Sequence, residues 1–570
     1  MSRIPLLPAT SLVAAALVLA ACNKADDTPA PATTGQTLVQ ADAGAISAAD
    51  FAERVKVLSS DEFGGRAPGS AGEEKTVAWL KEQFRSLGLK PGNDESYFQD
   101  VPMVETTADE STKLELQVAG KARELAFGSD MVVGTRSGET RVEINDSDLV
   151  FVGYGVNAPE LGWNDYAGVD VKGKTVVMFI NDPGFHTDDP ALFEGKRMTY
   201  YGRWTYKYEE AARQGAAAAL IIHDSDGASY GWDVVKNSWS GPQFDLAAAD
   251  DPEPRLPAQG WITADIARSL LADTGQDLEA LYTAANTPGF KAIPLDASMT
   301  VDLTSTVTRK SSKNVMALLP GSSRPDEAVV YMAHWDHLGD HREEGTDPAV
   351  DTIYNGAIDN ATGVAGILGI AQAFVAQEPA PERSVLFLAV TLEESGLLGS
   401  KYYVAHPSVP LDKTVAVINI DAMSVAGPSR DMTVVGKGSS ELEDILGRHA
   451  DAQGRTLTAE ATPESGFYFR SDHFNFAKAG VPALYASGGD DLVDGGVGAG
   501  KAAARDYGLN RYHQPADEFD PAWNLEGVVQ DLQALYGVGR DLASNDQWPN
   551  WYEGNAFRAA REAMMQKNAR

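Results

Sequence analysis

Histidines and acidic residues follow several predicted strands in the second half of this 570-residue chain. Near-continuous apolar runs, which are typical of buried parallel strands, cover residues 328–333, 384–390, 415–420 and 481–486. Polar groups stand at the ends of these runs or in the loops beside them: His334, Asp336, His337, Asp359, Glu393, Glu394, Asp421 and His513. Because open α/β sheets bind ligands beyond the carboxyl ends of their strands, we expect these side chains to share one site.

Two histidines and three carboxylates, with one carboxylate left over, form a donor set suited to two zinc ions. Imidazole and carboxylate both bind Zn²⁺, and two-metal hydrolytic sites hold their ions about 3.5–4 Å apart. The remaining carboxylate can act as a general base toward water acidified by the metals. Taken singly, each position has a structural explanation, such as a helix N-cap or a solvated surface pair. Five such positions together favour a metal centre, because carboxylates there need partners.

The pattern along the chain indicates which elements must position these groups. Two amphipathic helices are predicted at residues 48–58 and 73–87. Residues 114–303 consist mainly of short β-like runs, with one helix at 207–214, and predict a separate strand-rich insert. Strand and helix alternate over residues 314–542, which predicts a doubly wound α/β layer: a mostly parallel mixed sheet with helices on both faces.

Composition excludes several function classes. The chain has 47 Lys and Arg against 81 Asp and Glu, a formal net charge of −34, and is 43% hydrophobic. This is a globular composition long enough for more than one domain. Electrostatic binding to nucleic acid or to an anionic membrane is disfavoured, because it needs clustered Lys and Arg. The single cysteine, Cys22, excludes an intramolecular disulfide and leaves His and carboxylates as metal ligands.

The N-terminus carries an export pattern. Residues 11–21 form an apolar run that is too short to span a membrane and typical of a signal-peptide core. The run ends in Leu-Ala-Ala-Cys22, which resembles the bacterial lipobox. The resemblance implies a signal peptide over residues 1–21, a lipid on the cysteine, a tether over residues 22–47, and a location on the periplasmic side of the envelope. Asn23 favours the outer membrane by the same resemblance. Ordinary cleavage beside an incidental cysteine is the alternative.

Two motif matches fail their context tests. Residues 168–175 fit the P-loop pattern, but they lead into a β-branched run instead of a helix. Ser229, in Gly-Ala-Ser-Tyr-Gly, fits the nucleophile elbow of serine hydrolases, which needs a strand running directly into the serine. Polar residues 223–226 separate it from the preceding apolar run. A serine esterase using Ser229 therefore stays only an alternative.

Six short motifs carry a resemblance to a known family: His334-Trp335-Asp336, Asp359-Asn360-Ala361-Thr362-Gly363, Glu393-Glu394, Asn419-Ile420-Asp421-Ala422-Met423, Arg470-Ser471-Asp472-His473 and Tyr512-His513. Together they resemble the co-catalytic dizinc aminopeptidases, whose relatives include glutamate carboxypeptidase and the transferrin-receptor ectodomain. The resemblance reaches to about Asp541 and includes the loop over residues 61–69. It implies a zinc-exopeptidase-type α/β fold whose insert is a protease-associated domain.

The resemblance assigns a role to each residue of the set. Asp359 would bridge two zinc ions, with His334 and Asp421 completing one site and Glu394 and His513 the other. Glu393 would be the general base, and Tyr512 would hydrogen-bond the oxyanion. Asp336 would fix the tautomer of His334, and the bond between Asp359 and Asn360 would be cis. The match gives no ligand role to His337, His341 or His473, which we interpret as structural or pocket-lining.

The implied activity is hydrolysis of N-terminal residues from peptides by water activated between two zinc ions. The implied partners are peptides with a free N-terminus, with no nucleic acid and no membrane contact except the lipid. The expected domains are a peptidase domain over 48–120 and 300–545, the insert over 121–299 and a tail over 546–570. The oligomeric state, the preferred N-terminal residue and the native metal are not predicted.

Four alternatives to the aminopeptidase stay open. A carboxypeptidase of the glutamate type needs a positive cluster, for which the nearby candidates are Arg470, Lys478 and Arg511. A glutaminyl cyclase keeps one zinc, whereas five ligands are present here. A receptor-like binding protein would have lost ligands. A serine esterase is disfavoured because no predicted strand runs directly into Ser229.

Overall fold

The apolar runs form the centre of a mixed sheet. The computed structural model of the chain describes residues 46–187, 189–251, 253–343 and 345–568. Four mutually parallel strands lie side by side in the order β17 (Arg383–Val390), β14 (Arg324–His334), β18 (Thr414–Asn419) and β21 (Ala483–Gly488). Antiparallel neighbours flank them: β13 (Ile293–Leu319) on β17, and β19 (Asp431–Val434) on β21, followed by β20 (Thr456–Ala459).

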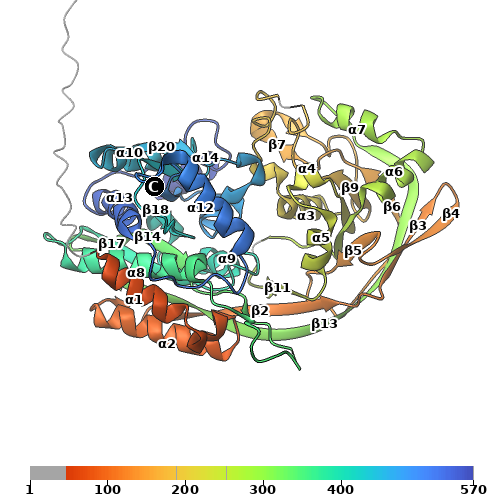
Figure 1. Cartoon of the computed structure of the whole chain (residues 1–570). Coiled ribbons are helices and arrows are strands. Elements are labelled where there is room, and N and C mark those ends of the chain that lie inside the picture. Colours follow the sequence, from red (N-terminus) through yellow and green to blue (C-terminus); the bar gives the residue numbers. More distant parts are fainter. Residues whose placement is uncertain (1–45, 188, 252, 344, 569–570) are drawn as a thin grey trace, which may run out of the picture. The chain divides into compact units, whose positions relative to one another are not determined.

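Helices cover both faces of this sheet, so the predicted α/β fold class is confirmed. Successive side chains of β14 point to opposite faces of the sheet and therefore pack in two different cores. Tyr331 packs in a core with helices α1 (Ala48–Leu58), α2 (Ala71–Ser86), α8 (Thr362–Ala376), α10 (Leu442–Ala452) and α13 (Glu526–Ala543). Met332 packs in the opposite core with α9 (Leu398–Ala405) and α11 (His473–Lys478). Figure 1 shows α1 and α8 side by side on their face.

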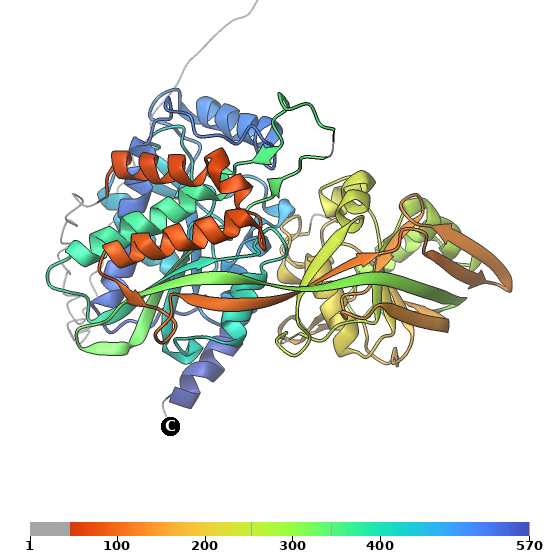
Figure 2. The ribbon, with the colours of Figure 1, turned by 90° about the horizontal axis from the view of Figure 1, so that it is seen from below.

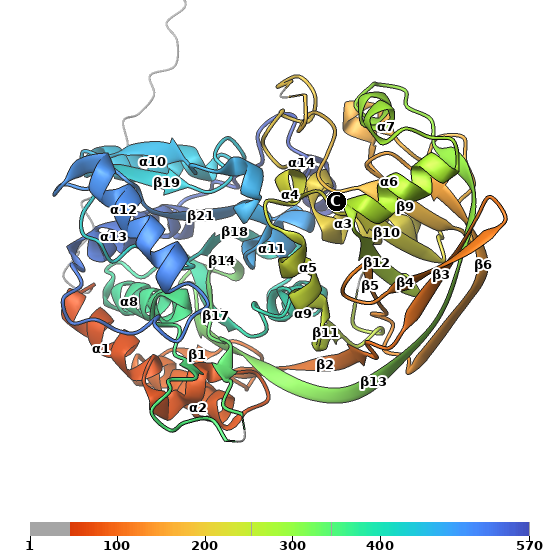
Figure 3. The same ribbon diagram turned by 45° about the vertical axis from the view of Figure 1, so that its right-hand side comes forward.

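The strand-rich segment forms a second sheet. Its strands lie in the order β4 (Lys121–Ala126), β3 (Lys113–Val118), β13, β6 (Arg141–Phe151), β9 (Thr175–Phe179), β10 (Ala218–Ile222), β12 (Ala258–Ile262) and β5 (Met131–Gly134). Helices α6 (Ala264–Asp273) and α7 (Leu278–Ala285) cover one face. The other face carries α3 (Trp204–Arg213) and α5 (Trp232–Trp239), as Figure 3 shows.

Two long strands connect the sheets. The second half of β13 pairs with β2 (Phe98–Ala108) over residues 305–315, while its first half pairs with β3 and β6. Figure 2 shows the two strands running together from one sheet to the other. The boundary expected at residues 120 and 121 falls in the turn between β3 and β4, which pair with each other in the second sheet.

Smaller elements surround these layers. Four short strands form two-stranded pairs, β7 (Asn157–Ala158) with β8 (Trp163–Asn164) and β15 (Gly339–Asp340) with β16 (Ile353–Tyr354). Two more strands extend the central sheet, β1 (Lys90–Pro91) along β13 and β11 (Pro242–Leu246) along β2. The remaining helices are α4 (Ser225–Ala228), α12 (Gly496–Asn510) and α14 (Arg558–Asn568).

The rejected P-loop match is a turn into a strand, as expected, because β9 begins at Thr175. The residues just after the rejected elbow lie in α5. The predicted signal peptide, Cys22 and most of the predicted tether lie outside the described residues.

Candidate metal centre

The predicted ligands come from five different segments at one end of the central sheet. His334 is the last residue of β14, and Asp421 follows β18 by two residues. Glu393 and Glu394 follow β17, and Asp359 lies in a turn over Ala357–Ala361 just before α8. His513 follows α12. The sheet therefore delivers these side chains to one place because its parallel strands end at the same edge.

One donor group gathers around His334, which is 1% exposed. Its Nε2 atom lies 3.2 Å from Oδ1 of Asp359 and 3.2 Å from Oδ1 of Asp421. These three residues offer ligand atoms within 4.8 Å of one another. One nitrogen and two carboxylate oxygens facing a common point suit a divalent cation such as zinc.

A second donor group uses the other oxygen of Asp359. Nε2 of His513 lies 3.3 Å from Oδ2 of Asp359 and 3.1 Å from Oε2 of Glu394. Asp359 thus turns one oxygen to each group, which is the arrangement of a carboxylate shared by two metal ions. The structure brings the five predicted ligands together in the two predicted groups.

The electrostatics of the site are dominated by buried carboxylates. Burial raises the pKa of Glu393 well above its ordinary value, and the nearby carboxylates of Glu394 and Asp421 raise it further. For Asp359, burial acts in the same direction, but hydrogen bonds from His334 and His513 outweigh it and hold the pKa well below its ordinary value. A cluster of like charges in a buried place needs cations, so the site fits the metals that its donor atoms suggest.

Asp336 lies behind His334 but contacts it differently from the prediction. Nδ1 of His334 lies 3.1 Å from the backbone carbonyl oxygen of Asp336, and 3.8 Å from its carboxylate. The carboxylate instead accepts the backbone N–H of Glu393 at 3.2 Å. The carbonyl therefore sets the tautomer of His334, while the carboxylate fixes the backbone of Glu393.

A buried carboxylate absent from the sequence prediction, Asp517, holds the loop of Asp359. It accepts the backbone N–H groups of Ile358 and Asp359, each at 3.0 Å. The peptide bond between Asp359 and Asn360 is cis, as expected. Asn360 then ties this loop to the next ligand, because it donates to the carbonyl of Ile420 at 3.0 Å.

Arg66 braces two ligand loops from the N-terminal part of the chain. Its guanidinium is 1% exposed and donates to the carbonyls of Trp335, Asn355 and Gly356 at 2.6–2.9 Å. Trp335 follows His334, and Gly356 precedes the turn of Asp359. The loop over residues 61–69, which the family resemblance includes, therefore holds both backbone segments through the buried guanidinium of Arg66.

The Arg-Ser-Asp-His motif supports Asp421. The hydroxyl of Ser471 donates to Oδ2 of Asp421 at 2.5 Å and accepts from the amide of Asn419 at 2.7 Å. Asp472 is buried and accepts from Ser400 at 2.6 Å. The fourth residue, His473, is buried between Tyr468 and Tyr485 and does not reach the ligands.

His337 is nearer to the centre than the sequence predicted. Its Nδ1 lies 2.6 Å from Oε1 of Glu394, and the residue is 1% exposed. His337, Asp359 and Glu394 also offer ligand atoms close enough together to hold a metal ion, so His337 lies beside the donor group that contains His513. The spacing of three residues after His334, at the same strand end, could have indicated this. His341, by contrast, is exposed and lies against Tyr354.

Tyr512 stands at the open side of the centre. It is 45% exposed, and its ring stacks on His513 with centroids 3.9 Å apart. Burial of the hydroxyl and the surrounding carboxylates, first Asp359, raise its pKa above the ordinary value. The phenol therefore stays protonated and can donate a hydrogen bond.

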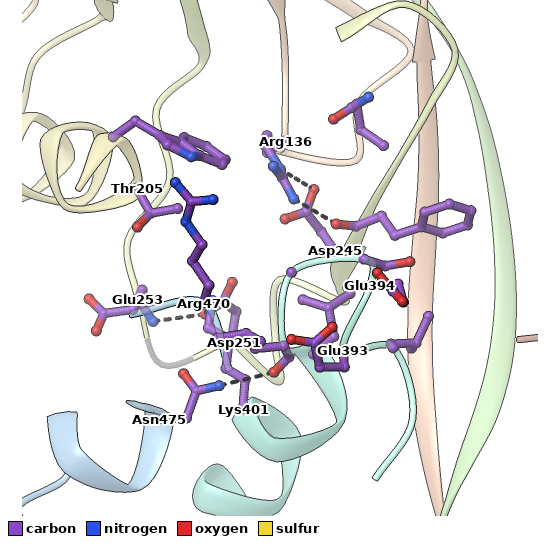
Figure 4. A pocket seen from close by; sticks show the side chains of 18 of the residues that line it. Arg136, Thr205, Asp245, Asp251, Glu253, Glu393, Glu394, Lys401, Arg470 and Asn475 are labelled. Carbon is purple, nitrogen blue, oxygen red and sulfur yellow. Dashed lines mark hydrogen bonds and ion pairs between the residues drawn. The ribbon is translucent and has the colours of Figure 1, made fainter. Parts of the chain in front are cut away.

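A cavity of about 720 Å³ opens at the centre and extends to the insert. Glu393, Glu394 and Tyr512 line it together with Thr205 and Arg470. Figure 4 shows the two glutamates on one side and Thr205 and Arg470 on the other. A cavity of this size accommodates a small peptide.

In the part of the chain that the structure describes, the serine of the rejected elbow hydrogen-bonds neither a histidine nor a carboxylate side chain. The hydroxyl of Ser229 lies 3.4 Å from the carbonyl of Glu464, and helix α4 precedes the residue where the motif requires a strand. His223, the nearest histidine in sequence, bonds to the carbonyl of Tyr230 at 3.0 Å. The serine esterase is therefore not supported.

Comparisons with known proteins agree with the motifs. Residues 314–536 match the model of peptidase family M28, so the resemblance is confirmed for that segment. The chain is 27% identical over 256 residues to aminopeptidase NAALADL1 of Mus musculus, covering 37% of this chain and 32% of that protein. It is 30% identical over 126 residues to a vacuolar membrane protease of Candida dubliniensis, covering 22% and 11%. The chain thus spans about a third or less of the length of these relatives.

Matches among solved structures include two aminopeptidases. An aminopeptidase from Aneurinibacillus sp. strain AM-1 is 20% identical, with a TM-score of 0.46, and the match covers 89% of this chain and 96% of that one. A zinc aminopeptidase from Bacillus subtilis is 17% identical, with a TM-score of 0.40, and the match covers 89% and 98%.

Proposed function

We propose that this chain, whose residues 314–536 match peptidase family M28, is an aminopeptidase that uses two zinc ions. The observation that carries the proposal is the pair of donor groups sharing Asp359, with a further, half-buried carboxylate, Glu393, beside them. His334 and Asp421 would hold one ion, and Glu394 and His513 the other. When bound, the two ions would polarise the substrate carbonyl and lower the pKa of a water molecule.

Glu393 is the residue that fits the general base. Within the described part of the chain its carboxylate hydrogen-bonds no histidine, unlike those of Asp359 and Glu394, and its raised pKa suits a group that accepts a proton and returns it. Its backbone is fixed by Asp336, so the carboxylate can be presented in one place. It would take a proton from water and give it to the leaving amine.

Tyr512 fits the oxyanion donor. Its hydroxyl is protonated at neutral pH, and the residue lines the cavity next to His513. A donor aimed at the developing negative oxygen stabilises the transition state by several kcal/mol in general. Acidic groups around the centre would also hold the α-ammonium of a peptide, which favours release of one N-terminal residue.

Glutamine in place of Glu393 tests this proposal. The variant keeps the shape of the side chain but cannot accept the proton. We expect both proteins to bind two zinc ions per chain, measured by elemental analysis, while kcat on aminoacyl-nitroanilides collapses in the variant. Activity unchanged in Glu393→Gln, or activity that survives complete chelation, would refute the proposal. Peptides with blocked N-termini should not be cleaved.

Two further proposals concern the insert and the N-terminal segment. The insert, which carries α3 and lines the cavity through Thr205, would be a protease-associated domain that covers or selects substrate. The lipobox-like run ending in Cys22 supports export and attachment to the periplasmic side of the envelope, with the outer membrane favoured by Asn23. Incorporation of a labelled fatty acid into wild type but not into Cys22→Ala would support the anchor, and equal labelling would contradict it.

A further inference from the structure

Most charged residues that line the cavity have a partner of opposite charge. Arg136 pairs with Asp245 at 2.7 Å. Asp251 binds both Arg255 and Lys401 at 2.6 Å, and Lys478 bonds Glu209 and Glu253 at 3.1 Å each. These pairs explain why a rim so rich in charge can exist, because a buried charge without a partner is costly.

Arg203 and Arg470 are exceptions. Both line the cavity, and within the described part of the chain neither forms an ion pair or donates a side-chain hydrogen bond. The Nε atom of each is buried without an acceptor. Arg470 lies over the ring of Phe467 at 5.2 Å, a contact that leaves its hydrogen-bond donors free.

The two guanidinium groups also act on each other. Burial lowers the pKa of Arg203 to about 10, and the positive charge of Arg470 contributes to the lowering. Tyr230 lies beside both arginines, but a phenol is neutral at pH 7 and cannot balance two positive charges. Two like charges held together in a cavity need an anion from elsewhere.

The two arginines come from different parts of the fold. Arg203 is the N-cap of the ten-residue helix α3 in the insert, whose first turn contains no acidic residue. Trp204 and Thr205 of that turn line the cavity, so the positive end of the helix adds to the field. Arg470 directly precedes Ser471, whose hydroxyl holds Asp421. Ser471 therefore links Arg470, at the positively charged end of the cavity, to the metal centre.

We propose that Arg203 and Arg470 form a subsite that binds a carboxylate group of the peptide substrate. The inference rests on the proposed peptidase function and specifies its substrate class. The carboxylate could be the C-terminus of a dipeptide or an acidic side chain on either side of the cleaved bond. Arginine suits this task because its planar donors bind a carboxylate through two hydrogen bonds.

Three substrate pairs distinguish the sources of the carboxylate, using the zinc-loaded full chain. Leu-Ala is compared with Leu-Ala-amide, Leu-Glu-amide with Leu-Gln-amide, and Glu-Ala-amide with Gln-Ala-amide. We expect the carboxylate member of at least one pair to have a kcat/KM about 10- to 100-fold higher, the scale of hydrogen bonds to a charged group. The preferred pair identifies the source.

The double variant Arg203→Gln, Arg470→Gln should remove this preference, mainly through KM, while neutral amides change less than about threefold, a factor below that of one such hydrogen bond. Arg309→Gln is the matched control, because Arg309 is exposed on β13 and does not line the cavity. Equal rates within all three pairs for wild type, or a preference that survives in the double variant, would overturn the proposal.

A binding measurement separates this inference from the proposed function. Glutarate should raise the unfolding temperature of the zinc-loaded wild type, while glutaramide should not, and the double variant should lose the shift. If no peptide is cleaved but this shift appears, the peptidase proposal fails and the subsite stands. If neutral amides are cleaved but glutarate gives no arginine-dependent shift, the subsite fails and the peptidase stands.

Discussion

Both sheets of this molecule carry aspartates at or near the ends of their parallel strands, but these aspartates have different partners in the two sheets. In the insert, Asp182 follows β9 and accepts from the backbone and hydroxyl of Thr199, at 2.8 and 2.5 Å. Asp224 follows β10 and pairs with His186 at 2.7 Å. In the central sheet, Asp359 and Asp421 converge on one histidine. Polar residues at strand ends therefore indicate a site only where carboxylates face one another instead of separate local donors.

The strongest test of this difference replaces one carboxylate in each sheet. Asp359→Asn removes the shared ligand of both donor groups, so we expect loss of bound zinc and a fall in kcat of about 10³-fold or more, the scale for a member of a catalytic set. Elemental analysis and nitroanilide hydrolysis measure both effects. Asp182→Asn is the control, and this variant protein should keep its bound zinc. Equal metal loss in the two variants would remove the distinction between the sheets.

A second test concerns the buried lysine of the insert. Nζ of Lys207 donates to the carbonyls of Tyr154, Asn181 and Tyr201 at 2.6–2.9 Å. Lys207→Met leaves these acceptors without donors, so we expect the free energy of unfolding to fall by about 3 kcal/mol. Urea denaturation measures the loss. Zinc content should stay unchanged, and a loss of zinc from the folded variant would contradict a purely structural role.

His337 provides a finer test within the metal centre. Because its imidazole bonds to Glu394, His337→Phe should weaken binding of zinc by about 10- to 100-fold, the usual effect of losing a partner of a ligand. Competition with a chromophoric chelator measures the affinity. His337→Gln, which keeps a donor, should recover part of it. His341→Phe should have no effect, and an equal weakening there would exclude a specific role for His337.

A further test is a pH dependence of stability in the insert. Burial raises the pKa of Asp165 to about 7, compared with about 3.9 in an unfolded chain. The stability that this raised pKa contributes is therefore complete below about pH 4 and lost as the pH rises through 7. Wild type should lose stability relative to Asp165→Asn over that range. Unfolding temperatures between pH 4.5 and 8 measure the difference, and a constant difference would contradict the prediction.

The sequence predicted the central sheet and the main site well, for a physical reason. Buried parallel strands are continuous apolar runs, so their ends are visible in the sequence, and the polar residues at those ends are few. His334, Asp421 and the two glutamates were located in this way. Asp359 and His513 were found in the loops beside these strands, and the resemblance carried by the six motifs then gave each residue its role.

Other parts of the site depend on contacts that no local pattern records. Asp517 holds the loop of Asp359 across 158 residues, and the carboxylate of Asp336 turned to the backbone of Glu393 instead of to His334. That Arg203 and Arg470 have no anionic partner in the described part of the chain could not be predicted either. Only the folded structure shows that neighbouring charges pair with each other and leave these two out.

Arg66 has a consequence for the order in which the molecule folds. Its bonds to Trp335, Asn355 and Gly356 close loops of 269, 289 and 290 residues. At synthesis rates of about 5–20 residues per second, the acceptors emerge some tens of seconds after the arginine. Contacts between such distant residues also carry a high loop-closure entropy and form slowly. We therefore expect both donor groups to take their final positions late, after the insert has formed its own core.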